Sequence, residues 1–275
     1  MTGMILLTGA TGFVGRQVLK SLTQEGKKIR AIVRDGSQHL ISDYPAVVDV
    51  ITTADLFSED ADWWSRACAG IDTVIHVAWY VESGLYLQSE KNLDCLIGTL
   101  TMAKGAIKAC VRRFVGVGTC FEYDLTAGVL STDTALRPLT PYAGTKAAVY
   151  TSLSQVLPQD GVEFTWCRLF YLYGEDEDER RLVPHLHSQL SANQPAKLTS
   201  GKQIRDFLDV SDAGVMLVEA ALGSAQGAVN ICSGIPITVR QLAEKIADGY
   251  GRRDLLRFGE RPDNLMDPPC VVGIK

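Results

Sequence analysis

A tyrosine and a lysine four positions apart form the strongest candidate for acid–base chemistry in this sequence. Tyr142 and Lys146 are separated by three residues, so a helix would place both side chains on one face. An ammonium held beside a phenol favours the phenolate and lowers a pKa that ordinarily lies near ~10. The pair is therefore predicted to move a proton, although the same spacing is also common among exposed helical pairs.

Three glycines near the amino terminus form a second candidate, suited to binding a phosphate. Gly9, Gly12 and Gly15 stand between the apolar run 4–8 and a helical pattern that continues to about residue 25. A loop without side chains lets backbone N–H groups at a helix amino terminus approach a pyrophosphate. The spacing differs from the Gly-x-Gly-x-x-Gly of most dinucleotide-binding domains, so a tight turn needed only for packing is the alternative.

Further segments join these two motifs in one pattern. They are Asp55-Leu56, His76-Val77-Ala78, Asn92 and the run from Phe114 to Tyr123. From residue 4 to about residue 262, the pattern resembles the extended short-chain dehydrogenase/reductases, the NAD(P)-dependent nucleotide-sugar epimerase/dehydratase family. The resemblance implies a catalytic triad of Thr119, Tyr142 and Lys146.

Each member of this triad has a role that the resemblance implies. Tyr142 transfers the proton, and Lys146 lowers the pKa of Tyr142 and holds the nicotinamide ribose. Thr119 hydrogen-bonds the reacting oxygen. For Thr119 alone, the alternative is a strand-end hydroxyl that bonds only the backbone.

The end of the second strand decides which dinucleotide is expected. Arg34 stands nineteen residues after Gly15 and would suit the 2'-phosphate of NADP. Asp35 follows it, and an inward-turned Asp35 would bind the ribose of NAD instead. We expect NADP, with NAD as the alternative. The resemblance places these residues at the cofactor: Gly9, Thr11, Gly12, Phe13, Val14, Gly15, Arg34, Asp55, Leu56, Val77, Ala78, Tyr142 and Lys146. The alternatives to cofactor binding are turn capping for Asp55 and simple core burial for Leu56, Val77 and Ala78.

Two arginines and a tyrosine are the candidates for binding a substrate. Arg205, in Arg205-Asp206-Phe207, is similar to a family arginine that contacts the diphosphate of a nucleotide sugar, and Arg261 resembles a second one. A guanidinium fork suits phosphate oxygens. Tyr171 stands where many family members have asparagine. For Arg205 and Arg261, the alternative is that both are solvated loop residues.

Departures from the family pattern narrow the expected reaction. Family dehydratases have Asp-Glu after the triad Ser/Thr, whereas Cys120 and Phe121 follow Thr119 here, so dehydration is disfavoured. We expect reduction of the 4-keto group of a nucleotide-activated 6-deoxyhexose, with hydride from NADPH and a proton from Tyr142. A 4-epimerase with retained NAD is the alternative, and a non-catalytic dinucleotide-binding regulatory protein is a further one.

The elements that must position these residues read as an α/β fold. Short apolar runs alternate with helical patterns and are typical of parallel strands covered on both faces. These runs lie at 4–8, 28–33, 47–51, 73–77, 114–117 and 163–169. We expect a doubly wound parallel (Rossmann) sheet over residues 1–172. Residues 173–275 are expected to form a smaller mixed substrate lobe, interleaved with the last Rossmann elements.

Two long predicted helices, 85–108 and 140–157, resemble the paired helices of family dimers, so a homodimer is expected. The formal charge of -5 disfavours a nucleic-acid partner. Seven scattered cysteines without a CxxC support no disulfide framework or zinc module. We expect a cytoplasmic protein with no export signal, no membrane span and no metal. The acidic stretch 175–179 is interpreted as a solvated loop edge, and His76 as structural.

Overall fold

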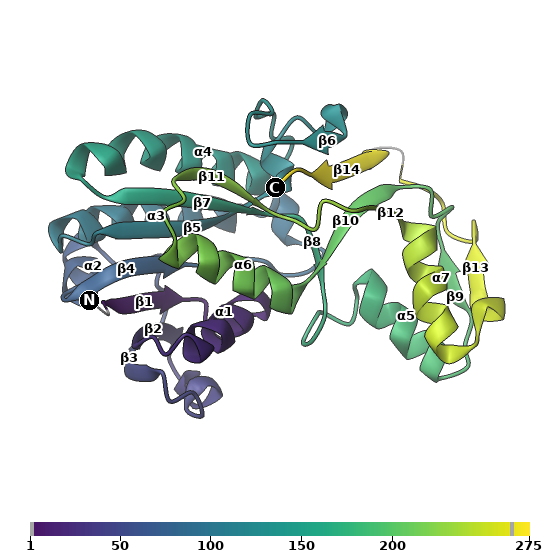
Figure 1. Cartoon of the computed structure of the whole chain (residues 1–275), viewed down its shortest axis with the longest axis horizontal. Coiled ribbons are helices and arrows are strands. Elements are labelled where there is room, and N and C mark those ends of the chain that lie inside the picture. Colours follow the sequence, from purple (N-terminus) through teal and green to yellow (C-terminus); the bar gives the residue numbers. More distant parts are fainter. Residues whose placement is uncertain (1–2, 265–266) are drawn as a thin grey trace.

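A seven-stranded parallel sheet forms the centre of the larger lobe in this computed structural model, which describes residues 3–264 and 267–275 (Figure 1). Its strands lie in the order β11-β7-β5-β4-β1-β2-β3. Their bounds are β1 Met4–Thr8, β2 Ile29–Arg34, β3 Val47–Thr53, β4 Ile71–His76, β5 Arg113–Thr119, β7 Glu163–Leu169 and β11 Gly227–Ile231. The chain runs from β1 out to β2 and β3, then crosses to β4 on the other side of β1. Ligands of such sheets bind at the carboxyl ends of the strands, where the strand order reverses.

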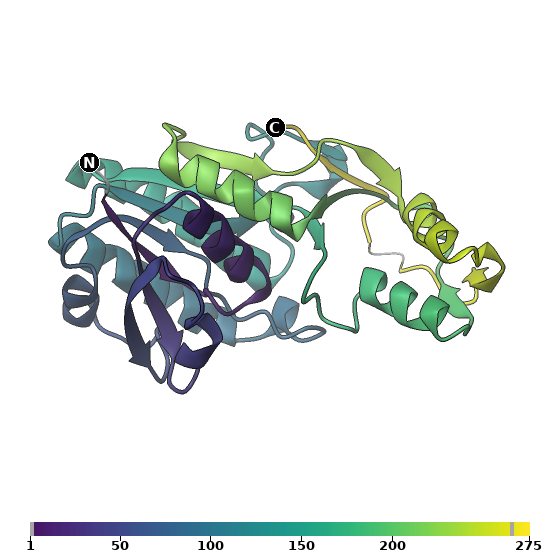
Figure 2. The same ribbon diagram turned by 60° about the horizontal axis from the view of Figure 1, so that its bottom comes forward.

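Helices cover both faces of this sheet (Figures 1 and 2). One layer holds α1 (Phe13–Gln24) and α6 (Val210–Leu222), and the other holds α2 (Ala61–Ala67), α3 (Lys91–Lys108) and α4 (Pro141–Val156). Every residue of β5 is buried, as the continuous apolar runs predict for a strand between two helical layers. The doubly wound fold class is confirmed.

The smaller lobe lies beyond the carboxyl ends of the strands (Figure 1). Its mixed sheet contains β6 (Val129–Leu130), β8 (Tyr171–Tyr173), β10 (Ile204–Asp209), β12 (Pro236–Thr238) and β14 (Cys270–Gly273). A separate core joins α5 (Leu182–Ser191) and α7 (Val239–Tyr250) to β9 (Ala196–Leu198) and β13 (Leu256–Phe258). Because α6 and β11 return to the large sheet, the two parts are interleaved. The boundary after residue 172 stays a prediction.

Short 3-10 helices connect several of these elements. They are η1 Gln38–Ile41, η2 Tyr86–Gln88, η3 Cys120–Glu122, η4 Leu125–Ala127, η5 Leu157–Asp160 and η6 Arg253–Leu255. The helix expected over 85–108 is divided: η2 ends at Gln88 and α3 begins at Lys91. The Asn92 amide donates to the carbonyl oxygens of Tyr86 and Ser89. Such side-chain bonds to the backbone compete with a continuous helix.

The outer surface of α3 carries exposed apolar side chains. Leu93 and Ile97 are 56% and 62% exposed, which is compatible with a partner on this helix, and the homodimer remains a prediction. None of the helices in the described ranges is both long and apolar enough to cross a membrane.

Candidate active site

A cavity of about 860 Å³ opens at the carboxyl ends of β1, β4, β5 and β7. It brings together residues from separate parts of the chain, and all of the predicted cofactor and triad residues line it. These are Gly9, Thr11, Gly12, Phe13, Val14, Gly15, Arg34, Asp55, Leu56, Val77, Ala78, Thr119, Tyr142 and Lys146. Tyr171 also lines the cavity, whereas Arg205 and Arg261 are not among its lining residues.

The glycine loop forms one end of this cavity and fits a pyrophosphate. Gly9 has a φ of 74°, and a Cβ there would lie 2.7 Å from the backbone nitrogen of Ala78. A Cβ on Gly15 would overlap the carbonyl oxygen of Gly9. The first turn of α1 has no acidic residue and its amino terminus has no side-chain cap. These backbone N–H groups therefore suit an anionic ligand.

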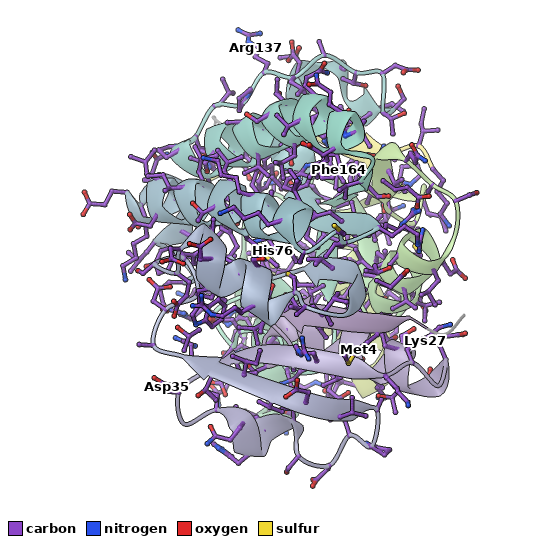
Figure 3. The ribbon with its side chains drawn as sticks, turned by 90° about the vertical axis from the view of Figure 1, so that its left-hand side faces the viewer. Met4, Lys27, Asp35, His76, Arg137 and Phe164 are labelled. Atoms are coloured by element: carbon purple, nitrogen blue, oxygen red, sulfur yellow. The ribbon has the colours of Figure 1, made fainter. Side chains whose placement is uncertain are left out.

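Arg34 and Asp55 lie where the adenosine end of a dinucleotide is expected. Arg34 is exposed and lines the cavity, while Asp35 is not among the lining residues and lies at the margin of the view in Figure 3. The Asp55 carboxylate accepts hydrogen bonds from Phe57 N (3.0 Å) and Ser58 Oγ (3.1 Å). Asp55 therefore caps a turn as well as facing the cavity, so it remains only a candidate for binding adenine.

Tyr142 is held near the amino terminus of α4. The Thr140 hydroxyl caps this helix by accepting from Ala143 N, and Pro141 occupies its first position. The Tyr142 ring meets the edge of Tyr86 with centroids 4.8 Å apart. Burial raises the pKa of Tyr142 well above its ordinary value, and a hydrogen bond with the Thr119 side chain opposes this shift. The phenol is therefore protonated at neutral pH.

Lys146 lies one turn further along α4 and is also buried. Its Nζ donates to the Val117 carbonyl oxygen (2.5 Å) and lies 3.8 Å from the Trp79 ring centroid. Burial lowers the pKa of Lys146 to about 7, while the nearby Glu122 carboxylate acts in the opposite direction. The net shift of the Tyr142 pKa is upward, because desolvation of the phenol is the largest influence on it, and the expected lowering by Lys146 stays a prediction.

Glu122 fixes the position of Thr119 and was missed in the sequence. Its carboxylate accepts from Thr119 N (2.8 Å), from Trp166 Nε1 (3.0 Å) and from Arg168 Nε (2.8 Å). The Thr119 hydroxyl accepts from Phe121 N (3.3 Å), so the backbone-bonding alternative for Thr119 holds in part. The acidic residue inside the run 118–123 was the available signal, but nothing in the sequence marked its buried partner.

His76, at the end of β4, is buried in the interior of the large lobe (Figure 3). Its Nδ1 lies 2.8 Å from Thr8 Oγ1 and its Nε2 3.0 Å from Thr99 Oγ1. Burial lowers the pKa of His76 to about 3, so the ring is neutral. The interpretation of His76 as structural is confirmed: it ties two strand ends to α3.

The two arginines predicted at the substrate have different environments. Arg205 is buried, forms an ion pair with Asp267 (2.7 Å), and lies over the Tyr171 ring, 5.1 Å from its centroid. Arg261 is exposed and donates its backbone N–H to Leu198 O. Arg205 therefore lies behind the Tyr171 wall of the cavity, and the Asp267 carboxylate already pairs with its guanidinium.

The acidic stretch 175–179 differs from the expected solvated loop edge at two residues. Glu177 and Asp178 line the cavity, and the Glu177 side chain is almost fully buried, whereas Glu175, Asp176 and Glu179 are exposed. Nothing in the sequence indicated this, because a run of five acidic residues does not identify which side chain is buried.

This site defines a class of protein. A glycine loop after the first strand of a doubly wound sheet shares one cavity with a tyrosine, a lysine and a threonine, the arrangement of a dinucleotide-dependent oxidoreductase. A sequence profile of the NAD dependent epimerase/dehydratase family matches residues 5–232. The chain belongs to this family and is an enzyme of it, so the resemblance seen in the sequence is confirmed.

Individual relatives are distant but match along nearly the whole chain. A dTDP-6-deoxy-L-talose 4-dehydrogenase (NAD(+)) of Aggregatibacter actinomycetemcomitans is 24% identical, with 98% of this chain and 99% of that protein covered. A CDP-abequose synthase of Salmonella muenchen is 23% identical, with coverage of 96% and 87%.

Solved structures share the fold at lower identity. A UDP-N-acetylglucosamine 4-epimerase from Methanobrevibacter ruminantium M1 has a TM-score of 0.86 at 18% identity, with 99% of this chain and 89% of that chain covered. A dTDP-glucose 4,6-dehydratase from Streptomyces venezuelae, solved with NAD bound, has a TM-score of 0.81 at 21% identity, with coverage of 98% and 88%.

Proposed function

We propose that the enzyme reduces the 4-keto group of a nucleotide-activated 6-deoxyhexose with NADPH. The observation that carries the proposal is the single cavity that holds the glycine loop, Thr119, Tyr142 and Lys146. The names of two relatives support this substrate class. One is a dTDP-6-deoxy-L-talose 4-dehydrogenase and the other is a CDP-abequose synthase. Cys120 and Phe121, in place of an acidic pair, argue against dehydration.

The environment of Tyr142 favours reduction. A buried phenol with a raised pKa keeps its proton at neutral pH and can give it to a carbonyl oxygen. When bound, the dinucleotide supplies hydride from its nicotinamide. Thr119 holds the substrate oxygen by its hydroxyl, and Tyr142 donates the proton that turns this oxygen into the product hydroxyl. Lys146, on the same helix face, holds the nicotinamide ribose and supplies positive charge as the phenolate forms.

Turnover tests this function directly. Purified enzyme with NADPH should oxidise the cofactor, seen as loss of absorbance at its reduced-nicotinamide band, when offered nucleotide 4-keto-6-deoxy sugars. A panel that varies the nucleotide and the sugar separately identifies both. Absence of turnover on every member would contradict the proposal.

The second candidate is a 4-epimerase that retains NAD, which the UDP-sugar 4-epimerases among the structural neighbours favour. An epimerase oxidises and reduces the same carbon, so its cofactor stays bound through purification. Denaturing the purified protein and identifying the released nucleotide by chromatography separates the two, because only the epimerase is expected to retain NAD in stoichiometric amount.

We expect Arg34→Ala to narrow the preference for NADPH over NADH by about 1 to 3 kcal/mol, the scale of a charge-assisted hydrogen bond to the 2'-phosphate. Affinities of both cofactors, from nicotinamide fluorescence, give the measurement. Arg137→Ala is the control, since Arg137 is exposed and does not line the cavity. Equal affinities of the wild-type enzyme for NADPH and NADH would mean that Asp35, and not Arg34, recognises the ribose. The name of one relative, which contains NAD(+), would agree with that result.

We also propose that Arg205 binds the diphosphate, which would replace Asp267 as the partner of its guanidinium. Arg205→Ala should raise KM for the nucleotide sugar and leave reduction of a small free ketone nearly unchanged, because remote binding energy orients the sugar. Steady-state kinetics on both substrates measure the difference. Equal loss of both activities, with a lowered melting temperature, would mean that Arg205 only stabilises the fold beneath Tyr171.

A further inference from the structure

The segment 174–181 crosses from one wall of the cavity to the other. Asp176 forms an ion pair with Arg16 on α1 (2.5 Å), next to the glycine loop. Arg180 forms an ion pair with Glu82 (3.2 Å), in the loop that precedes η2. The segment is therefore held at both ends, on the two sides of the cavity.

Between these two anchors, the Glu177 side chain is only 4% exposed, and Glu177 is one of the residues that line the cavity. One carboxylate oxygen, Oε1, lies 3.8 Å from Arg181 Nε. The other oxygen, Oε2, is buried and accepts no hydrogen bond from the described part of the chain. Burial raises the pKa of Glu177 to about 7, although the Arg181 guanidinium and the Gly174 amide favour the charged form.

A buried carboxylate oxygen that no protein group bonds is costly, because burial removes it from bulk water without supplying a donor from the described chain. An unsatisfied buried group in a native protein calls for an explanation, and a functional role at a cavity is one. The reacting end of the cavity is close, since the Arg181 charge acts on Tyr86, whose ring lies against Tyr142.

We propose that Glu177 is a ligand-binding residue whose free oxygen accepts a hydrogen bond from a hydroxyl or amide group of a molecule in the cavity. Two molecules carry such donors at this end: the hexose of the substrate, through its hydroxyl groups, and the nicotinamide half of the cofactor, through its ribose hydroxyls and carboxamide. The identity of these molecules rests on the proposed function. The contact itself rests on the unpartnered oxygen.

Three variants test the proposal. Glu177→Leu removes the acceptor and keeps the bulk, while Glu177→Gln keeps an acceptor oxygen. Glu179→Gln is the matched control, because Glu179 belongs to the same segment but is exposed and does not line the cavity. For each variant, three quantities are measured: the melting temperature without ligand, the Kd of NADPH by fluorescence, and the Kd of dTDP-glucose by calorimetry with NADPH present.

We expect Glu177→Leu to melt at the same temperature as wild type or higher, since it removes an unsatisfied buried charge. We also expect one of the two dissociation constants to rise by about tenfold or more, and Glu177→Gln to stay within about threefold of wild type. A rise in the NADPH constant identifies the cofactor as the donor, and a rise only in the dTDP-glucose constant identifies the sugar.

Unchanged affinities for both ligands in Glu177→Leu would overturn the proposal, whatever the melting temperature. Neither binding measurement needs turnover. An enzyme that binds both ligands but reduces no 4-keto sugar would therefore contradict the proposed reaction while leaving the role of Glu177 to be decided by the affinities.

Discussion

Tyr142→Phe is expected to lower turnover by about 10²–10⁴-fold, the usual contribution of a positioned proton donor. The phenylalanine ring keeps the edge contact with Tyr86, so the cavity wall is preserved. Only the hydroxyl group is lost, and with it the proton for the substrate oxygen and the hydrogen bond with Thr119. Cofactor affinity should stay within about threefold of wild type, which makes the loss one of kcat. Steady-state kinetics and a cofactor titration measure the two effects.

Tyr150→Phe is the matched control for this prediction. Tyr150 lies two turns further along α4, packs on Phe164 and Trp166, and does not line the cavity. Removing its hydroxyl group should leave turnover nearly unchanged. If Tyr142→Phe kept wild-type turnover as well, Tyr142 would be excluded as the proton donor, and the Tyr–Lys pair would be a packing feature of the helix.

The sequence predicted the features that depend on local pattern. The β7 strand has the expected bounds, and α4 lies within the helix expected over 140–157, because both are marked by local sequence pattern. The glycine loop and the three triad positions also share one cavity, because the fold class brings the carboxyl ends of parallel strands to one edge.

What the sequence did not predict depends on contacts between distant segments. The raised pKa of Tyr142 comes from burial and from the neighbouring Tyr86 of η2, more than fifty residues earlier in the chain. The partner of Arg205 is Asp267, and periodicity contains no information about such a pair. Nor could the acidic-then-basic run 175–181 identify Glu177 as the residue with the buried side chain, since its neighbours pair with Arg16 and Glu82, which lie far away in the sequence.

The second large effect concerns stability rather than chemistry. Glu122→Ala is expected to lower the free energy of unfolding by about 3 to 5 kcal/mol, because it leaves the buried Arg168 guanidinium without its counter-ion. The same carboxylate accepts from Thr119 N and Trp166 Nε1, so two further donors lose their acceptor. Urea denaturation, followed by tryptophan fluorescence and by circular dichroism, gives the free energy.

A double substitution separates the contribution of the Glu122–Arg168 ion pair to stability from that of the other Glu122 contacts. Removing both charges, as in Glu122→Leu with Arg168→Met, should cost less than the sum of Glu122→Leu and Arg168→Met alone, because no unpaired charge is left in the interior. Asp62→Ala breaks the exposed ion pair with Lys108 and should leave the urea midpoint nearly unchanged. A Glu122→Ala variant as stable as Asp62→Ala would mean that water reaches Arg168, and that Glu122 is not what holds Thr119 at the end of β5.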